Sequence, residues 1–190
     1  ADAEGGFLPL VCTLNAARVL GAGAAMLNTD HAGLDRLALA AAPGAGGLTL
    51  LPYLDGERTP NLPNATGSLH GLTRSNATPE NLARAVVEGM LLGLAAAVDA
   101  VRAAGCPVHR VLLIGGAAAS VAVQEVAADV FGVPVAIPSP GEYVAVGAAR
   151  QAAWALAGGD APPAWDVAVD VTIDPDEAGR ARAAEVRGRY

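Results

Sequence analysis

Lysine is absent from this chain of 190 residues, in which all 12 basic side chains are arginine. The absence excludes a P-loop with its phosphate-binding lysine and any mechanism that forms a Schiff base on this chain. Aromatic residues make up 4% of the sequence and the net charge is −7, and no basic stripe with interleaved aromatics occurs. Nucleic acid is therefore not expected as a partner.

Cysteines and long apolar runs are also scarce. Cys12, Cys106 and the three histidines show no spacing typical of metal ligands, so no metal site is expected within this chain. Two reduced thiols in the cytoplasm are the simpler interpretation. The apolar run from Gly89 to Val98 is far shorter than the roughly 20 residues of a membrane span, so no membrane segment is expected.

Hydrophobic residues, by contrast, make up 53% of the sequence, which is enough for one domain with a substantial core. The first residue is alanine, and no basic segment with an apolar core follows it, so no signal peptide is expected at this end. We expect the chain to be a piece of a longer protein.

The stretch from Val111 to Ser120 has the most distinctive pattern. Four aliphatic residues at its start are typical of a strand buried on both faces, and the apolar spacing from Val123 to Val130 predicts a helix behind it. Gly115 and Gly116 lie between the two. Glycines let the backbone approach a ligand, and the first turn of a helix favours an anion, so the pattern indicates a phosphate site. A plain tight turn is the alternative interpretation.

The other elements follow from hydrophobic spacing and from the positions of glycine and proline. Helices are expected at 7–27, 32–41, 79–104 and 142–157, strands at 48–54, 67–73, 109–114 and 133–137, and an extended segment with a charged helix at 166–190. Strands and helices alternate from residue 109 at the spacing of βαβ units, which predicts that the last two strands are parallel. Gly89 and Gly93 each lower helix propensity by about 1 kcal/mol, so we expect close packing there.

Several motifs resemble those of the FGGY family of carbohydrate kinases. Its second signature is similar to Gly67-Ser68-Leu69-His70-Gly71-Leu72 followed, after a spacer, by Asn81-Leu82-Ala83-Arg84-Ala85-Val86-Val87-Glu88. A loop of the xylulokinase branch is similar to Leu51-Pro52-Tyr53-Leu54 with Gly56-Glu57-Arg58-Thr59-Pro60. Ile114-Gly115-Gly116-Ala117 resembles the family's nucleotide-binding glycine turn, and Gly147-Ala148-Ala149 its last core helix.

The resemblance implies an α/β fold, namely one lobe of an actin-like, ribonuclease-H-like ATPase with a mixed sheet flanked by helices. Residues 1–160 would form the C-terminal, nucleotide-side lobe and residues 161–190 a C-terminal tail, while the N-terminal catalytic lobe would lie outside this chain. The implied reaction moves the γ-phosphoryl group of ATP, with Mg²⁺, to a sugar hydroxyl, most closely that of D-xylulose, in a bacterial cytoplasm. Without the other lobe this chain is expected to be inactive.

Six residues carry over from the family as nucleotide contacts. Gly115, Gly116 and Ala117 would bring backbone against the nucleotide, and Ser120 would lie near the adenine. On the other adenine wall the resemblance places Asn15 and Arg18. No residue of this chain matches the catalytic base, and none is nominated as a catalytic residue or as a metal ligand.

Two alternatives remain open. The substrate could be ribulose, gluconate or glycerol, because the residues that read the sugar would lie in the missing lobe. The chain could also be a non-catalytic interaction module, for instance one that supplies a homodimer interface through its sheet edge or tail. An open apolar face beside Gly116 would favour a missing lobe, and a closed polar surface would favour an independent module.

Overall fold

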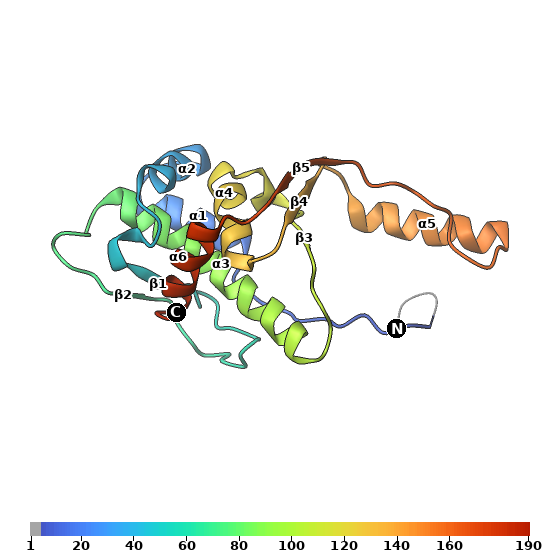
Figure 1. Ribbon diagram of the computed structural model, residues 1–190, viewed down its shortest axis with the longest axis horizontal. Coiled ribbons are helices and arrows are strands. Elements are labelled where there is room, and N and C mark those ends of the chain that lie inside the picture. The colour runs from blue at the N-terminus through green and yellow to red at the C-terminus, as the bar shows by residue number, and fades with distance from the viewer. Residues whose placement is uncertain (1–4) are drawn as a thin grey trace.

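The computed structural model describes residues 5–190, and most of its elements pack around one long central helix (Figure 1). The helices are α1 (Ala17–Met26), α2 (His31–Ala40), α3 (Pro79–Ala103), α4 (Val121–Phe131), α5 (Tyr143–Ala157) and α6 (Glu177–Arg187), with 3-10 turns η1 (Ala45–Gly47) and η2 (Gly116–Ala119). The strands are β1 (Thr49–Leu51), β2 (Ser68–His70), β3 (Val111–Leu112), β4 (Val135–Pro138) and β5 (Val169–Ile173). No helix of the described residues is long and apolar enough to cross a membrane.

The strands form two small sheets. β1 and β2 pair antiparallel, and β3, β4 and β5 form a mixed sheet in that order. Val111 lies opposite Val135 in a parallel pair, which confirms the predicted βαβ unit. The segment that we expected to be a tail contributes β5, which pairs antiparallel with β4, and α6, which packs on α4. The described part of the tail is thus integral to the packing of this lobe.

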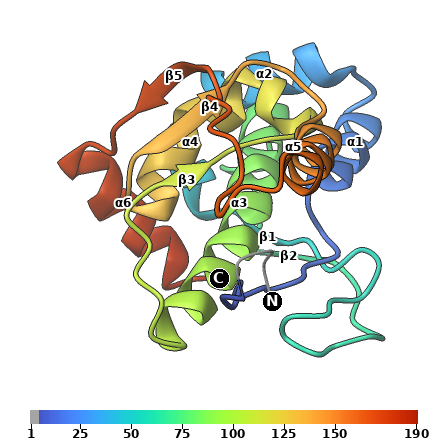
Figure 2. The same ribbon diagram turned by 90° about the vertical axis from the view of Figure 1, so that its right-hand side faces the viewer.

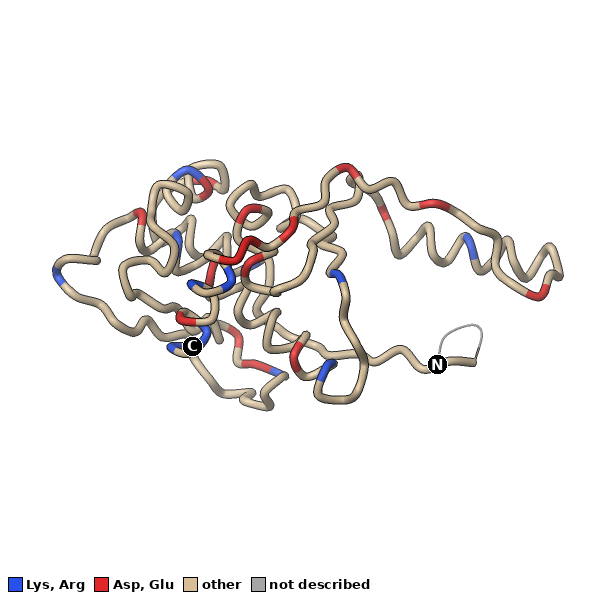
Figure 3. Tube along the Cα trace, viewed as in Figure 1, with Lys and Arg blue, Asp and Glu red and all other residues tan. Residues whose placement is uncertain are grey.

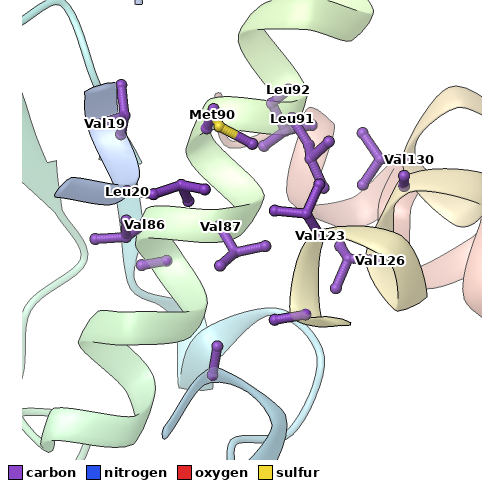
Figure 4. Close-up of a cluster of buried hydrophobic side chains, with 14 of the residues drawn as sticks. Val19, Leu20, Val86, Val87, Met90, Leu91, Leu92, Val123, Val126 and Val130 are labelled. Atoms are coloured by element: carbon purple, nitrogen blue, oxygen red, sulfur yellow. The ribbon is translucent and has the colours of Figure 1, made fainter. Parts of the chain in front are cut away.

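Helix α3 forms the centre of the core. Its start follows from local chemistry, because the Thr78 side chain accepts a hydrogen bond from the amide of Asn81 and Pro79 occupies the first turn. Apolar side chains of α3 lie between α1 on one side and α4 on the other, as Figure 4 shows for Val86, Val87 and Met90. These three side chains are fully buried.

Close packing at a glycine of α3 is confirmed. A Cβ atom added at Gly89 would lie 2.3 Å from the carbonyl oxygen of Leu50 in β1, which is far inside van der Waals contact. A glycine also allows the close approach of α1 to α3, since a Cβ atom added at Gly23 would lie 2.6 Å from a methyl group of Val86. Small residues therefore set the distance of α3 from its neighbours.

Two expected elements differ in the structure. The predicted helix at 7–27 is wrong in its first half, because α1 begins only at Ala17. Pro9 favours an extended residue before it, and Asn15 binds a loop far away in the sequence instead of an adjacent turn. The expected last core helix, α5, contains no buried residue and extends away from the body (Figure 1). Among residues 5–190, the segment after α5 contacts it through hydrogen bonds from Arg150 to the carbonyl oxygen of Pro163 and from Trp154 to that of Gly159, but these contacts bury none of its residues.

Candidate functional site

The glycine turn lies at the carboxyl end of β3, where ligands bind in open α/β sheets. Both glycines are exposed, and a Cβ atom added at either position would meet no atom within 4 Å. Gly115 has a φ of +89°, which few residues other than glycine adopt, whereas Gly116 begins η2. The turn therefore presents bare backbone to solvent at a position suited to a ligand.

Three hollows meet at Gly116. The first, which we call the α1–α2 hollow, has a volume of about 420 Å³ and lies between α1, α2 and η2. The second is an apolar groove of about 510 Å³ between β3, α3 and the segment before α1. The third, of about 560 Å³, lies over the ends of β4 and β5 and the start of α5. The open apolar face expected beside a missing lobe is present.

The lining of the α1–α2 hollow combines small apolar and polar side chains. Its residues are Ala17, Leu20, His31, Ala32, Asp35, Gly116, Ala117, Ala119 and Ser120. Sequence reasoning had named three of these, but it missed His31 and Asp35. These two residues are four positions apart on α2 and share one face of that helix, which was the available signal.

The carboxylate of Asp35 lies at the amino end of α4 and compensates the positive end of the helix dipole. One carboxylate oxygen accepts a hydrogen bond from the Ser120 hydroxyl at 2.6 Å, and the other accepts one from the amide of Val121 at 3.0 Å. The same hydroxyl accepts a hydrogen bond from the amide of Val123 at 3.1 Å. The positive end of this helix therefore already faces a carboxylate. A phosphate at the first turn of α4, one of the positions that the sequence suggested, would meet this negative charge.

Asn15 is buried and holds the loop that follows β1. Its amide nitrogen donates to the carbonyl oxygen of Gly56 at 2.6 Å and to Oε2 of Glu57 at 3.0 Å, and its oxygen accepts from the amide of Leu54 at 3.0 Å. The other candidate near α1, Arg18, is exposed and forms an ion pair with Asp55 at 3.2 Å. Neither Asn15 nor Arg18 lines any of the three hollows at the glycine turn.

Glu57 is a buried carboxylate in this loop. Its Oε1 accepts hydrogen bonds from the amides of Leu14 at 2.8 Å and Arg58 at 2.7 Å. Burial alone raises the pKa of Glu57, but the hydrogen bonds from Asn15 and these backbone amides outweigh it, and the pKa lies below its ordinary value of 4.5. Glu57 is therefore held ionised.

Glu57→Gln in the full-length protein is expected to lower the free energy of unfolding by about 1–3 kcal/mol near neutral pH. The side-chain NH2 group of the new glutamine would face the NH2 group of Asn15, and two donors cannot form a hydrogen bond. Asn15 cannot turn away, because its hydrogen bonds to Gly56 and Leu54 fix its side chain. The pKa of Glu57 is lower in the folded state than its ordinary value of 4.5. The stabilisation by the ionised carboxylate is therefore fully present above pH 4.5 and is lost as the pH falls through the folded-state pKa. Urea unfolding of both proteins at several pH values measures the difference.

The matched control is Glu125→Gln, an exposed carboxylate on α4. It is expected to change the unfolding free energy by less than about 0.5 kcal/mol at each pH. A loss for Glu57→Gln that stays constant as the pH falls below 4.5 would contradict an ionised Glu57.

Two residues of the second signature motif have structural roles. Gly71 has a φ of +74°, and a Cβ atom there would lie 2.4 Å from the carbonyl oxygen of Gly47. In α3, the buried Glu88 accepts hydrogen bonds from the amide of Gly44 at 2.9 Å and from Nε of Arg84 at 2.6 Å. The motif therefore fastens β2 and α3 to the segment before β1, and neither residue lines the hollows at Gly116.

Comparison with known families gives a match over residues 14–156 to the FGGY family of carbohydrate kinases, C-terminal domain. This chain belongs to that family. It is 43% identical over 192 residues to the xylulose kinase of Streptomyces coelicolor, covering 99% of this chain and 38% of that protein. The family membership confirms the resemblance that the signature motif and the glycine turn had indicated.

Solved structures of FGGY kinases agree with this assignment. The xylulose kinase of Bifidobacterium adolescentis superposes with a TM-score of 0.86 and 49% identity, over 99% of this chain and 38% of that one. A gluconate kinase of Lactobacillus acidophilus gives a TM-score of 0.81 and 26% identity, over 94% and 37%. The fold is that of an actin-like ATPase lobe. The chain spans well under half the length of each of these proteins.

Proposed function

We propose that the full-length protein is an ATP-dependent carbohydrate kinase that converts D-xylulose to D-xylulose 5-phosphate, and that this chain supplies its nucleotide-side lobe. The observation that carries the proposal is the exposed glycine turn at the carboxyl end of β3, which borders a hollow between two helices. The similarity to xylulose kinases, which extends over almost the whole chain, favours D-xylulose. In this proposal residues 1–160 form the main part of the lobe, residues 161–190 complete it through β5 and α6, and the N-terminal catalytic lobe lies outside this chain.

The α1–α2 hollow fits an adenine. Its volume of about 420 Å³ lies within the range of small-molecule sites, and its walls combine small apolar side chains with a few polar groups. Ala17, Ala117 and Ala119 would contact the base, and His31 would stand at its polar edge. Ser120 would add a contact through a hydroxyl already oriented by Asp35.

The phosphates would bind at the glycine turn. As the first residues of η2, Gly116 and Ala117 have amides with no acceptor inside that turn. Gly115 would let the phosphates approach the chain closely. Arg18, at the start of α1 and exposed, would add positive charge, whereas Asn15 would act indirectly by holding the loop after β1.

Mg²⁺ does not fit a site made by this chain alone. Residues 5–190 contain no group of three or more histidine, cysteine or acidic side chains that could hold a metal ion. We propose that the ion arrives with ATP and takes its protein ligands from the other lobe. The residues of this chain bind and orient the nucleotide, and the base for the sugar hydroxyl lies elsewhere in the protein.

The test is a coupled assay of ADP release by the full-length protein with D-xylulose, D-ribulose, gluconate and glycerol. We expect the highest kcat/KM with D-xylulose and no turnover by the 190-residue chain alone. A preference for gluconate would keep the family and change the substrate, and the structural likeness to a gluconate kinase makes that the second candidate. Turnover of none of the four with ATP would overturn the proposal and favour a non-catalytic interaction module.

We place the full-length protein in the reducing cytoplasm of a bacterium. Both cysteines of the chain, Cys12 and Cys106, are free thiols, which such a compartment preserves. We also propose that the assembled kinase forms a homodimer, and sedimentation of the full-length protein measures this directly. A stable monomer at working concentrations would exclude a dimer as a requirement for activity.

A further inference from the structure

The Ser120 hydroxyl carries one hydrogen atom, and the groups around it determine where that hydrogen points. The amide of Val123 donates to the hydroxyl oxygen at 3.1 Å, and an oxygen of the Asp35 carboxylate lies 2.6 Å from it. An aspartate carboxylate at neutral pH only accepts hydrogen bonds, so Ser120 donates to Asp35. The other oxygen of Asp35 accepts from the amide of Val121 at 3.0 Å, which fixes the orientation of the carboxylate. The one hydrogen of Ser120 is thus committed to Asp35 and is not offered to a ligand.

The Ser120 and Asp35 side chains both line the α1–α2 hollow, where they present only acceptors. The Ser120 oxygen keeps one lone pair beyond its bond from Val123, and the Asp35 carboxylate has lone pairs alone to offer. Within residues 5–190 no arginine lines this hollow. Arg36 follows Asp35 on α2, where Figure 3 shows the two opposite charges close together, but it is not among the lining residues. We call this pair of side chains, Ser120 and Asp35, the acceptor wall.

The acceptor wall is held in place by the packing of two helices. Asp35 lies on α2, and Ser120 is the residue that caps α4. Figures 1 and 2 both place α2 beside α4, and each of these helices packs on α3. Leu34, adjacent to Asp35, and Val123, in the turn that Ser120 caps, are 1% and 0% exposed. The backbone under each side chain is therefore anchored in the core before any ligand binds, so the wall is preorganised.

We infer that Asp35 is a positioning residue that makes the hollow selective for a 6-amino purine, an inference that rests on the proposed nucleotide function. Adenine carries an amino group at position 6, which donates hydrogen bonds, whereas hypoxanthine and guanine carry an oxygen there, which accepts them. An amino group can donate to Ser120 at the acceptor wall. A 6-oxo group in the same place would lose its hydrogen bonds to water and gain none. A site built to pair one polar group rejects a ligand without that group more strongly than a difference in size would allow.

Inosine triphosphate (ITP), whose base is hypoxanthine, is the probe for the first test. With its preferred sugar substrate, the full-length protein is expected to show a kcat/KM at least about 30-fold higher with ATP than with ITP. In Asp35→Asn the amide oxygen keeps the bond from Val121, because the reverse orientation would set two donors against each other. The NH2 group of the asparagine then donates to Ser120, whose hydrogen is free to turn into the hollow. The ATP-to-ITP ratio is expected to fall by at least about tenfold.

Asp30→Asn is the matched control, because it removes the same charge at the start of the same helix. Asp30 caps α2 by accepting a hydrogen bond from the amide of Gly33 at 2.7 Å, and it does not line the hollow. Asparagine caps helices as well as aspartate does, so the ATP-to-ITP ratio should stay within about twofold of that of the unmodified protein. If Asp35→Asn lowers kcat/KM equally for both nucleotides, or changes the ratio no more than Asp30→Asn does, the inference is overturned.

Nucleotide binding without a sugar gives a readout that depends on neither catalysis nor a variant. In a calorimetric titration of the unmodified full-length protein, ADP is expected to bind at least about tenfold more tightly than inosine diphosphate (IDP). Equal affinities, or no binding of either nucleotide, would overturn the inference. Phosphoryl transfer from ATP with no preference over ITP would also overturn it, while the proposed function would stand. Tighter binding of ADP than of IDP, without turnover of any of the four candidate substrates, would support the inference and overturn the proposed function.

Discussion

Replacing Gly116 with valine in the full-length protein is expected to raise the KM for ATP by on the order of 10- to 100-fold, because a branched side chain would displace phosphates from two or three backbone hydrogen bonds. The folded chain itself should tolerate the substitution, since a Cβ atom at this position meets nothing within 4 Å. Sugar binding measured without nucleotide should change little. Steady-state kinetics with ATP varied, combined with a calorimetric titration of the sugar, measures both effects.

Gly159→Val is the control for this experiment. Its added Cβ atom meets only the carbonyl oxygen of Ala161, at 3.7 Å, and Gly159 lines none of the hollows at the glycine turn. The KM for ATP should therefore stay within about twofold of the unmodified protein. An unchanged KM in Gly116→Val would show that Gly115 and Gly116 form a turn without a role in nucleotide binding.

Gly89→Ala is expected to lower the free energy of unfolding by about 2–4 kcal/mol, although alanine is the better helix former. The added methyl group would lie 2.3 Å from the carbonyl oxygen of Leu50, so β1 or α3 must shift. Backbone cannot rotate out of the way as a flexible side chain can. Urea unfolding of the full-length protein, followed by circular dichroism, measures the loss.

The matched control is a glycine on another helix. Gly21→Ala in α1 would bring a Cβ atom no closer than 3.9 Å to His31, which is ordinary contact. Alanine there should stabilise the helix by up to about 1 kcal/mol. If both substitutions stabilise the protein, the close approach of α3 to β1 does not limit the packing.

Elements bounded by strong local signals were predicted almost to the residue. The helix expected at 79–104 is observed at Pro79–Ala103, where the Thr78 cap and Pro79 mark its start. The helix expected from the apolar spacing of Val123 to Val130 ends beside that pattern, at Gly132, which adopts the left-handed conformation. Caps and left-handed glycines act through hydrogen bonds and torsions within a few residues, so the information they carry is present in a short window of sequence.

Hydrophobic spacing alone was misleading where distant contacts compete with it. The apolar residues from 7 to 16 fit a helical period, but Asn15 forms hydrogen bonds to Gly56 and Glu57, about 40 positions away. Composition likewise predicted α5 as a core helix, and the described chain offers it no core to join. The hydrophobic pattern of a sequence indicates which residues need to be buried. Which segment of the chain buries them depends on the order and arrangement of the elements in the fold.

The candidate site divides in the same way. A run of aliphatic residues ending in two glycines was enough to place an exposed turn at the carboxyl end of a parallel strand, because strand, turn and helix are all local. The adenine-sized hollow could not be read from that run. The hollow depends on Asp35, which accepts a hydrogen bond from the Ser120 hydroxyl 85 positions away. It also depends on α1 and α2, which lie beside the turn because both pack against α3. Burial of apolar surface brings those helices together, and it depends on the whole chain.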